Sequence, residues 1–230
     1  MDAAWASLVE LLPAVPVTLR VTGVSAALAT LLALGAGALR LSTHRGLRVL
    51  SGAYVEVFRG TSALVQIFWF FFVLPLFGLS LTPHQAGIAA LSLNIGAYGA
   101  EVVRGSILAV PAIQVEAAIA LNMTARQRLR RVVIPQALPL MIPQAGNLAV
   151  SLLKATSLLS LVTIVEMTSR AQAIRERTGD EAPVYGALLV VYFILSLVIG
   201  GVASGLERRA SRHLPDLRRE RKPVPMEVPA

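Results

Sequence analysis

Long stretches without a charged residue limit most strongly how this 230-residue chain can fold. Residues 21–39 form one such stretch, and residues 60–100 form a longer one that is interrupted only by His84. Because about 20 apolar residues cross a bilayer, the first predicts one span, and the second, which turn residues divide near Pro75 and Pro83, predicts two. Residues 132–165, with Lys154 inside, and residues 182–206 predict one span each. The sequence therefore predicts an all-α integral membrane protein with five transmembrane helices.

Composition supports this class and removes several others. Only 15% of the residues are charged and the mean hydropathy is +0.68, whereas about a quarter of a soluble domain is charged. The chain has no cysteine, which excludes disulfides, Cys-ligated zinc and a thiol nucleophile. Its two lysines precede Ala155 and Pro223, so neither can belong to a phosphate-binding Walker loop, which needs Lys followed by Ser or Thr. We expect no catalytic residue, no metal site and no cofactor bound by this chain.

The placement of the cations predicts the orientation of the chain. Fourteen of the 21 Lys and Arg residues fall between spans one and two, between spans three and four, or after span five, in regions that share one side of a five-span protein. By the positive-inside rule that side is cytoplasmic, which puts the N-terminus outside and the C-terminus inside. The net charge of +8 then reflects topology and lipid headgroups, and we expect no nucleic-acid partner.

Three regions follow from this topology. Residues 1–15 form an extracytoplasmic segment, either a short interfacial helix or a lead-in to the first span. Residues 16–206 form the transmembrane domain, and residues 207–230 form a basic cytoplasmic tail that has little to bury.

The cytoplasmic loop 111–135 is the most informative segment. Its apolar residues recur at helical spacing and form one stripe, which consists of Ile113, Ala117, Ala120 and Leu121. Asn122 can end this helix in a left-handed conformation, and Thr124 can cap a second helix that carries four arginines. A DNA-binding helix-turn-helix has a similar pattern, but spans on both sides would keep this loop from a major groove. A plain basic loop would explain the arginines and leave the apolar stripe unexplained.

This loop resembles the EAA loop of the permease subunits of ABC importers. The shared spacing is Glu116-Ala117-Ala118, three residues, Asn122, nine residues and then Val132-Val133-Ile134-Pro135, with Asn122 in place of the usual glycine. Segments 56–66, 96–105 and 153–158 are similar to the polar amino-acid branch of these permeases. Within that branch, segments 58–66 and 116–122 are most similar to permeases for ectoine and hydroxyectoine.

The resemblance implies an ABC importer type I permease that moves ectoine, hydroxyectoine or a related polar amino acid by alternating access. It implies three partners: a cytoplasmic ATPase dimer that binds ATP and Mg, a second permease subunit, and an extracytoplasmic solute-binding protein. In the family the helix of the EAA loop docks on the ATPase and couples it to the spans. Carried over to this sequence, the coupling residues are Glu116, Ala117, Ala118, Leu121 and Asn122.

A few ionisable residues lie within or beside the predicted spans. Glu56 and Arg59, like Glu101 and Arg104, are spaced i, i+3 near the predicted cytoplasmic ends, so we expect structural ion pairs in preference to a gating role. Lys154 and Glu166 have no local partner, and twelve helical residues separate them by about 18 Å. These two residues, with Thr156 and Ser157, are candidates to line the substrate pathway.

Two questions stay open at this point. Glu166 could equally lie at the outer interface beside Arg170. A self-contained ion-coupled transporter or channel for a small zwitterionic solute is the alternative function, in which Lys154 and Glu166 would be coupling or selectivity charges.

Overall fold

A computed structural model describes residues 2–211, which are helical with short connections and contain no strand. In chain order the α-helices are α1 (Asp2–Leu11), α2 (Val15–Arg40), α3 (Arg45–Gly60), α4 (Ala63–Phe68), α5 (Pro83–Leu108), α6 (Ala112–Ala120), α7 (Ala125–Arg128), α8 (Ile134–Ala155), α9 (Met167–Thr178) and α10 (Glu181–Ser211). Short 3-10 segments lie at Leu12–Ala14, Leu74–Phe77 and Thr156–Val162, and π segments lie at Trp69–Val73 and Leu129–Val133.

Four continuous helical stretches of the described chain are long and apolar enough to cross a membrane: Trp5–Arg40, Pro83–Leu108, Ala125–Val162 and Glu181–Ala210. A fifth stretch is broken, because Arg45–Gly60 and Ala63–Phe77 meet at an angle of 104°. Counted with this broken span, the five match the predicted number. The prediction placed the start of the second span too late, at residue 60. The helix also continues across the predicted boundary at residues 15 and 16.

Small side chains let the central helices approach closely. A Cβ added to Gly99 of α5 would lie 2.6 Å from the Cβ of Ala33 in α2, and one added to Gly146 of α8 would overlap the Cβ of Ala203 in α10. The small residues of the third span therefore make their close contacts within the chain. The last span carries the spacing Gly201-x-x-x-Gly205, which favours close helix contacts, but both glycines face open space and Ala203 between them makes the contact.

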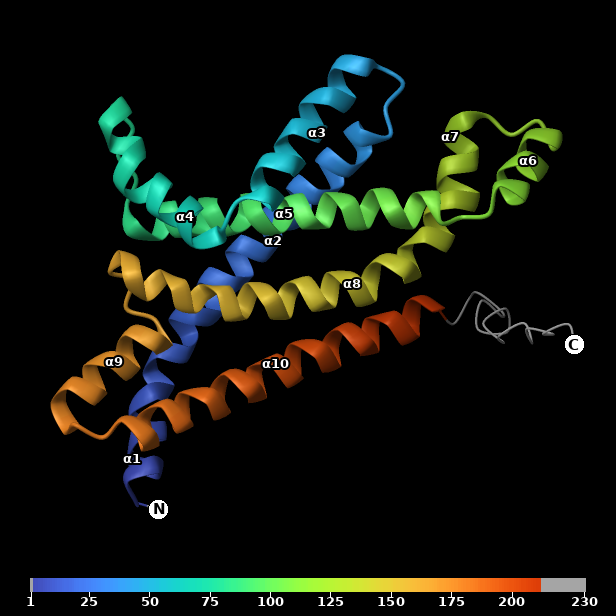
Figure 1. The fold of residues 1–230 in the computed structure, drawn as a ribbon. Helices are drawn as coiled ribbons and strands as arrows, with labels where there is room; N and C mark the ends of the chain where they lie inside the picture. The colour runs from blue at the N-terminus through green and yellow to red at the C-terminus, as the bar shows by residue number, and fades with distance from the viewer. Residues whose placement is uncertain (1, 212–230) are drawn as a thin grey trace, which may run out of the picture.

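The two ends of the bundle carry different structures (Figure 1). Helices α6 and α7 form a hairpin at one end, which we call the α6 end, and α7 runs on through the π segment into α8. At the opposite end, which we call the α9 end, α9 packs against α1 and α10 through buried residues that include Leu11, Ala171 and Val184. The predicted tail lies outside the described residues from residue 212 onward, and residues 207–211 are the last turns of α10.

Candidate functional site

The turn after α6 has the backbone conformation that the sequence predicted. Asn122 has φ of 55°, in the left-handed region, and the N–H of Met123 donates to the carbonyl of Ala118 at 3.1 Å. The N–H of Asn122 donates to the carbonyl of Ile119 at 2.8 Å, so the last turn of α6 is closed by hydrogen bonds. Thr124 then begins α7 with a capping box, in which its hydroxyl accepts from the N–H of Gln127. The two short helices are thus fixed to each other by their connection.

The left-handed turn gives a first testable prediction. A β-branched residue tolerates this conformation poorly, so Asn122→Val should destabilise the turn by about 1–2 kcal/mol, whereas Asn122→Gly should leave it intact. Hydrogen–deuterium exchange of the peptide that contains residues 119–123 measures this directly. We expect about ten-fold faster exchange in the valine variant. Equal exchange in both variants would show that the left-handed conformation is not required.

The predicted coupling residues do not all face the same way. Glu116, Ala117, Leu121 and Asn122 are at least partly exposed, and so are the other members of the apolar stripe; Ile113 and Leu121 have 73% and 76% of their surface exposed. Ala118 is buried, with 3% exposed, and faces the body of the protein. Ala118 is therefore not part of the exposed surface of α6, because one residue further along a helix turns the side chain by about 100°, and the role of the five residues in coupling stays a prediction. We call the exposed set Ile113, Glu116, Ala117, Ala120, Leu121 and Asn122 the α6 face.

The base of the α6–α7 hairpin is held by contacts that sequence spacing did not show. Val110, Val133 and Ala137 form a small buried cluster that joins the end of α5 to the start of α8. The Nη1 atom of Arg128 donates to the carbonyl of Met123 at 3.2 Å, so this arginine closes the hairpin. Arg126, Arg130 and Arg131 are exposed. The hairpin is therefore anchored at its base while the α6 face stays free within the described chain.

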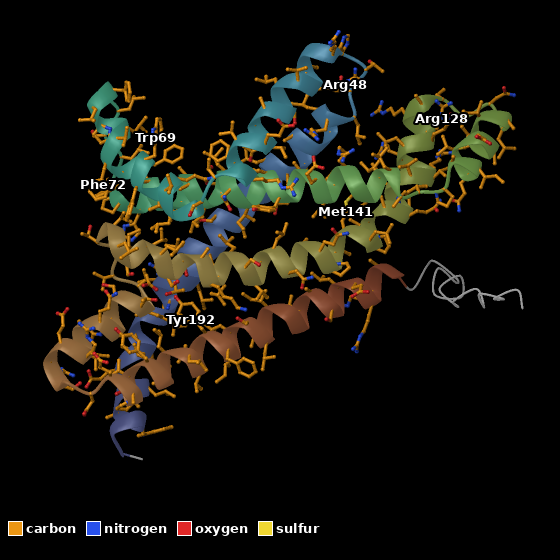
Figure 2. All side chains as sticks on the ribbon, viewed as in Figure 1. Arg48, Trp69, Phe72, Arg128, Met141 and Tyr192 are labelled. Carbon is orange, nitrogen blue, oxygen red and sulfur yellow. The ribbon has the colours of Figure 1, made fainter. Side chains whose placement is uncertain are left out.

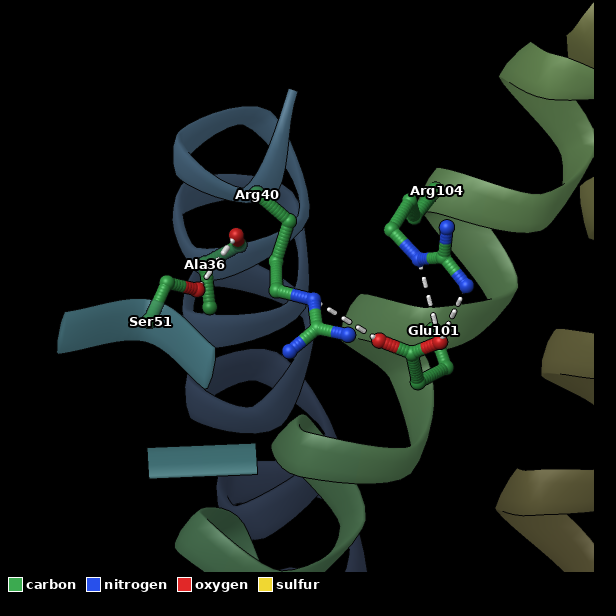
Figure 3. A network of polar contacts seen from close by, with 5 residues as sticks. All are labelled: Ala36, Arg40, Ser51, Glu101 and Arg104. Carbon is green, nitrogen blue, oxygen red and sulfur yellow. Dashed lines mark hydrogen bonds and ion pairs between the residues drawn. The ribbon is translucent and has the colours of Figure 1, made fainter. Parts of the chain in front are cut away.

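A charged cluster connects α2 and α5 in the half of α5 that leads to this hairpin (Figure 3). Glu101 forms the predicted ion pair with Arg104, whose Nε and Nη2 atoms donate to Glu101 Oε2 at 3.1 and 3.0 Å. Its other oxygen, Oε1, lies 3.1 Å from Arg40 Nε, a partner that the sequence did not reveal. Ser51 of α3 donates to the carbonyl of Ala36 at 2.7 Å close by. These contacts fix three helices to one another near the α6 end.

The second predicted ion pair does not form. Glu56 and Arg59 are both exposed, and no ion pair joins them within the described chain. The Arg59 guanidinium lies instead over the ring of Tyr98 in α5, 5.1 Å from the ring centroid. A cation over an aromatic face is attracted by the electrons of the ring, which explains why Arg59 turns away from the carboxylate one turn earlier.

The break between α3 and α4 is held by side-chain amides. The carbonyl of Phe58 accepts from Gln66 Nε2 and from Asn94 Nδ2, each at 2.9 Å. Gln66 Nε2 also contacts the hydroxyl of Thr61 at 2.7 Å. Carbonyls that a broken helix frees inside a membrane need such partners, because the N–H groups of the interrupted helix no longer reach them. Figure 2 shows how the arm beyond the break, with Trp69 and Phe72, extends away from Arg48 at the tip of α3.

The four predicted pathway residues lie near the α9 end and do not form one site. Lys154 is exposed on the last turn of α8, while Thr156 is fully buried and donates to the carbonyl of Leu153 at 2.7 Å. Ser157 donates to the carbonyl of Lys154 at 2.8 Å. Within residues 2–211, neither a hydrogen bond nor an ion pair joins Lys154 to Glu166. Their role in a pathway therefore stays a prediction.

Glu166 is fully buried and begins α9. Its Oε1 accepts from the N–H of Ser169 at 3.0 Å, and its Oε2 accepts from the hydroxyl of Tyr192 at 3.1 Å. Burial raises the pKa of Glu166 above its ordinary value, and hydrogen bonds from Thr168, Ser169 and Tyr192 oppose that rise. The side chain of Arg170 contacts the carbonyl of Glu10 and not Glu166. Glu166 therefore fastens α9 to α10 as a helix cap.

An apolar cavity of about 300 Å³ lies between α2, α5 and α8. Its walls are aliphatic apart from the hydroxyl of Thr30, and they include Ala33, Gly99 and Met141. A cavity with this lining offers no partner for a charged solute.

Comparisons with known proteins give a consistent result. Residues 25–212 match the family described as binding-protein-dependent transport system inner membrane component. The probable amino-acid ABC transporter permease protein y4tF of Sinorhizobium fredii is 46% identical over 179 residues, which cover 75% of each chain. The L-cystine transport system permease protein TcyB of Bacillus subtilis is 38% identical over 198 residues, which cover 86% of this chain and 85% of TcyB. A solved amino acid ABC transporter crystallised with histidines has a TM-score of 0.82 at 31% identity, over 87% of this chain and 94% of its own.

Proposed function

Since this chain belongs to the family of binding-protein-dependent transport system inner membrane components, we propose that it is the permease subunit of an ABC amino-acid importer. Its five spans have the type I permease fold of the structural relatives. Transport proceeds by alternating access and breaks no bond in this chain. ATP is hydrolysed, with Mg, by a separate ATPase dimer.

The observation that carries this proposal is the exposed α6 face. Apolar side chains at a loop tip remain in water only at a cost, and Ile113 and Leu121 are each about three-quarters exposed. A groove on the ATPase would cover them, and the fixed turn at Asn122 would transmit its movement to α8. A self-contained ion-coupled transporter would have no use for such a face.

The topology and partners follow from the same assignment. The cations near α6, α7 and the end of α10 support a cytoplasmic α6 end, and the α9 end would then face the solute-binding protein. Five spans enclose little by themselves, so a second permease subunit, identical or paralogous, would complete the pathway. The open Gly201 and Gly205 of α10 are available for contact with that subunit or with lipid.

We propose a polar amino acid or an ectoine as the substrate. The similar proteins named for amino acids and L-cystine favour the first class. The resemblance of segments 58–66 and 116–122 to ectoine and hydroxyectoine permeases supports the second class. All of these solutes carry a carboxylate and a cationic nitrogen.

Substrate-stimulated ATP hydrolysis tests the function and separates these solutes. The permease is purified with its ATPase, reconstituted in liposomes and supplied with its binding protein and L-histidine, L-cystine, ectoine or hydroxyectoine in turn. We expect one class to raise hydrolysis above the solute-free rate. A complex that hydrolyses ATP at the same rate with every solute, and takes up none of them, would overturn the proposal.

A further inference from the structure

Two ionisable groups on the broken span have no counter-ion within the described chain. Arg59 and Glu56 are both exposed, and in residues 2–211 the guanidinium of Arg59 meets only the ring of Tyr98. The other exposed cations of the same helix, Arg45 and Arg48, lie in its first turns, and Figure 2 shows Arg48 near the tip of α3. Arg59 therefore differs from the cations that mark the membrane surface.

The break places the backbone of Arg59 deep in the bundle. The neighbouring carbonyl of Phe58 is bonded to Asn94, which lies about 16 Å along α5 from Pro83 and about 21 Å from Leu108. The hydrocarbon core is about 30 Å thick, so the break lies in its interior, and Tyr98 is one turn nearer the α6 end. A cation that faced lipid there would cost about 2.5–3.5 kcal/mol. This face must therefore meet a water-filled path or protein.

The chemistry of this face suits a zwitterion. Arg59 presents a planar guanidinium whose N–H groups can bind a carboxylate at two points, and Tyr98 holds it by one face. Glu56, one turn away along α3, offers a carboxylate to a cationic nitrogen. The apolar cavity between α2, α5 and α8 offers neither group.

We propose that Arg59 binds the carboxylate of the transported solute midway through the membrane, with Tyr98 positioning the guanidinium and Glu56 receiving the cationic end. This inference rests on the proposed importer function and assigns the solute site to the broken span. The Lys154 side chain, at the α9 end of α8, is then outside that site.

Thiol labelling tests the location without relying on transport. Because the chain has no cysteine, Ser62→Cys at the break introduces its only thiol, and Leu31→Cys, at a side chain that is 69% exposed near the middle of α2, is the matched lipid-facing control. A charged methanethiosulfonate reagent needs water around the thiolate, so we expect the Ser62→Cys variant to react at least about ten-fold faster than the Leu31→Cys variant in the reconstituted complex. Equal, slow labelling of both variants would overturn the proposal.

Protection from labelling tests the chemistry. The transported solute, L-histidine, L-cystine or ectoine, should slow labelling of the Ser62→Cys variant, whereas the same solute with its carboxyl group converted to an amide should not. The protection should disappear when Arg59→Gln is added to Ser62→Cys. Equal protection by the acid and its amide, or protection that survives in the double variant, would overturn the carboxylate assignment.

Solute uptake by the reconstituted complex measures the effect of losing the Arg59 guanidinium. Arg59→Gln should lower ATP-driven uptake by about ten-fold or more, as expected when a charge-assisted hydrogen bond is lost, and Arg59→Lys should restore part of it. Arg48→Gln, the same change at the tip of α3, should leave uptake and ATPase co-purification within about two-fold of wild type. Uptake by Arg59→Gln at the wild-type rate would overturn this inference and leave the importer function standing. Failure of the wild-type complex to transport any of these solutes would instead overturn the importer function.

Discussion

Replacing Leu121 with glutamate is expected to separate the permease from its ATPase. Leu121 is, with Ile113, one of the two large apolar side chains of the α6 face and is 76% exposed, so a partner that covers this face would bury it. Removing such an anchor typically costs about 2 kcal/mol or more, which corresponds to about thirty-fold weaker association. Desolvation of the new carboxylate adds to that cost. Co-purification with the ATPase and stimulated ATP hydrolysis should both fall by this factor or more.

Ile119→Glu is the matched control for this experiment. Ile119 is also an apolar residue of α6, and its side chain is 51% exposed. Because it comes two residues before Leu121, helical geometry turns its side chain away from the α6 face. The same carboxylate is introduced into the same helix with the same change in net charge. If both variants lose the ATPase equally, the effect is a general one of charge on α6 and the α6 face is not the docking surface.

Glu101→Ala is expected to cause the largest loss of stability. The substitution leaves Arg40 and Arg104 facing each other between α2 and α5 without the carboxylate that joins them. Breaking a fully buried pair costs about 3–5 kcal/mol, and because these side chains keep between 19% and 35% of their surface exposed, we expect about 2 kcal/mol. For a chain of this size that lowers the Tm by about 4–8 °C.

Thermal denaturation of the detergent-solubilised protein measures this difference. Glu176→Ala serves as the control, because the Glu176 side chain is 71% exposed and only contacts Arg175 at 4.0 Å. Its Tm should stay within about 2 °C of wild type. An equal drop in both variants would mean that the cluster in Figure 3 does not hold α2 and α5 together.

Hydropathy predicted the spans because a transmembrane helix forms its backbone hydrogen bonds within itself. It therefore requires only sufficient length and apolar side chains, and both can be counted in the sequence. It missed the start of the second span because residues 45–59 include Arg45, Arg48, Glu56 and Arg59, and α3 is strongly amphipathic. The 104° break at residues 60–62 was not visible either. In the sequence, residues 60–62 are simply the start of an uncharged stretch. The interruption is recognised only in the structure, where the side-chain amides of Gln66 and Asn94 donate to the freed carbonyl of Phe58.

Local pattern also predicted much of the α6 hairpin. The helical spacing of apolar residues predicted the exposed stripe, and the turn-forming residues predicted the left-handed Asn122 and the Thr124 cap. All three features depend on neighbours within a few residues. The burial of Ala118 was not predicted, because a motif gives residue identity without the direction of the side chain. Contacts between distant segments were beyond the sequence: Arg40 pairs with Glu101 across two helices, and Tyr98 draws Arg59 away from Glu56.

The most direct test of the central claim is solute uptake into liposomes that contain the permease with or without its ATPase. The solute is the one that stimulates hydrolysis most, and ATP and Mg are supplied on the side of the ATPase. An ABC importer permease should give uptake only when the ATPase is present and ATP is hydrolysed, and none with a non-hydrolysable analogue. Sustained uptake by the permease alone, driven by an ion gradient, would contradict the account.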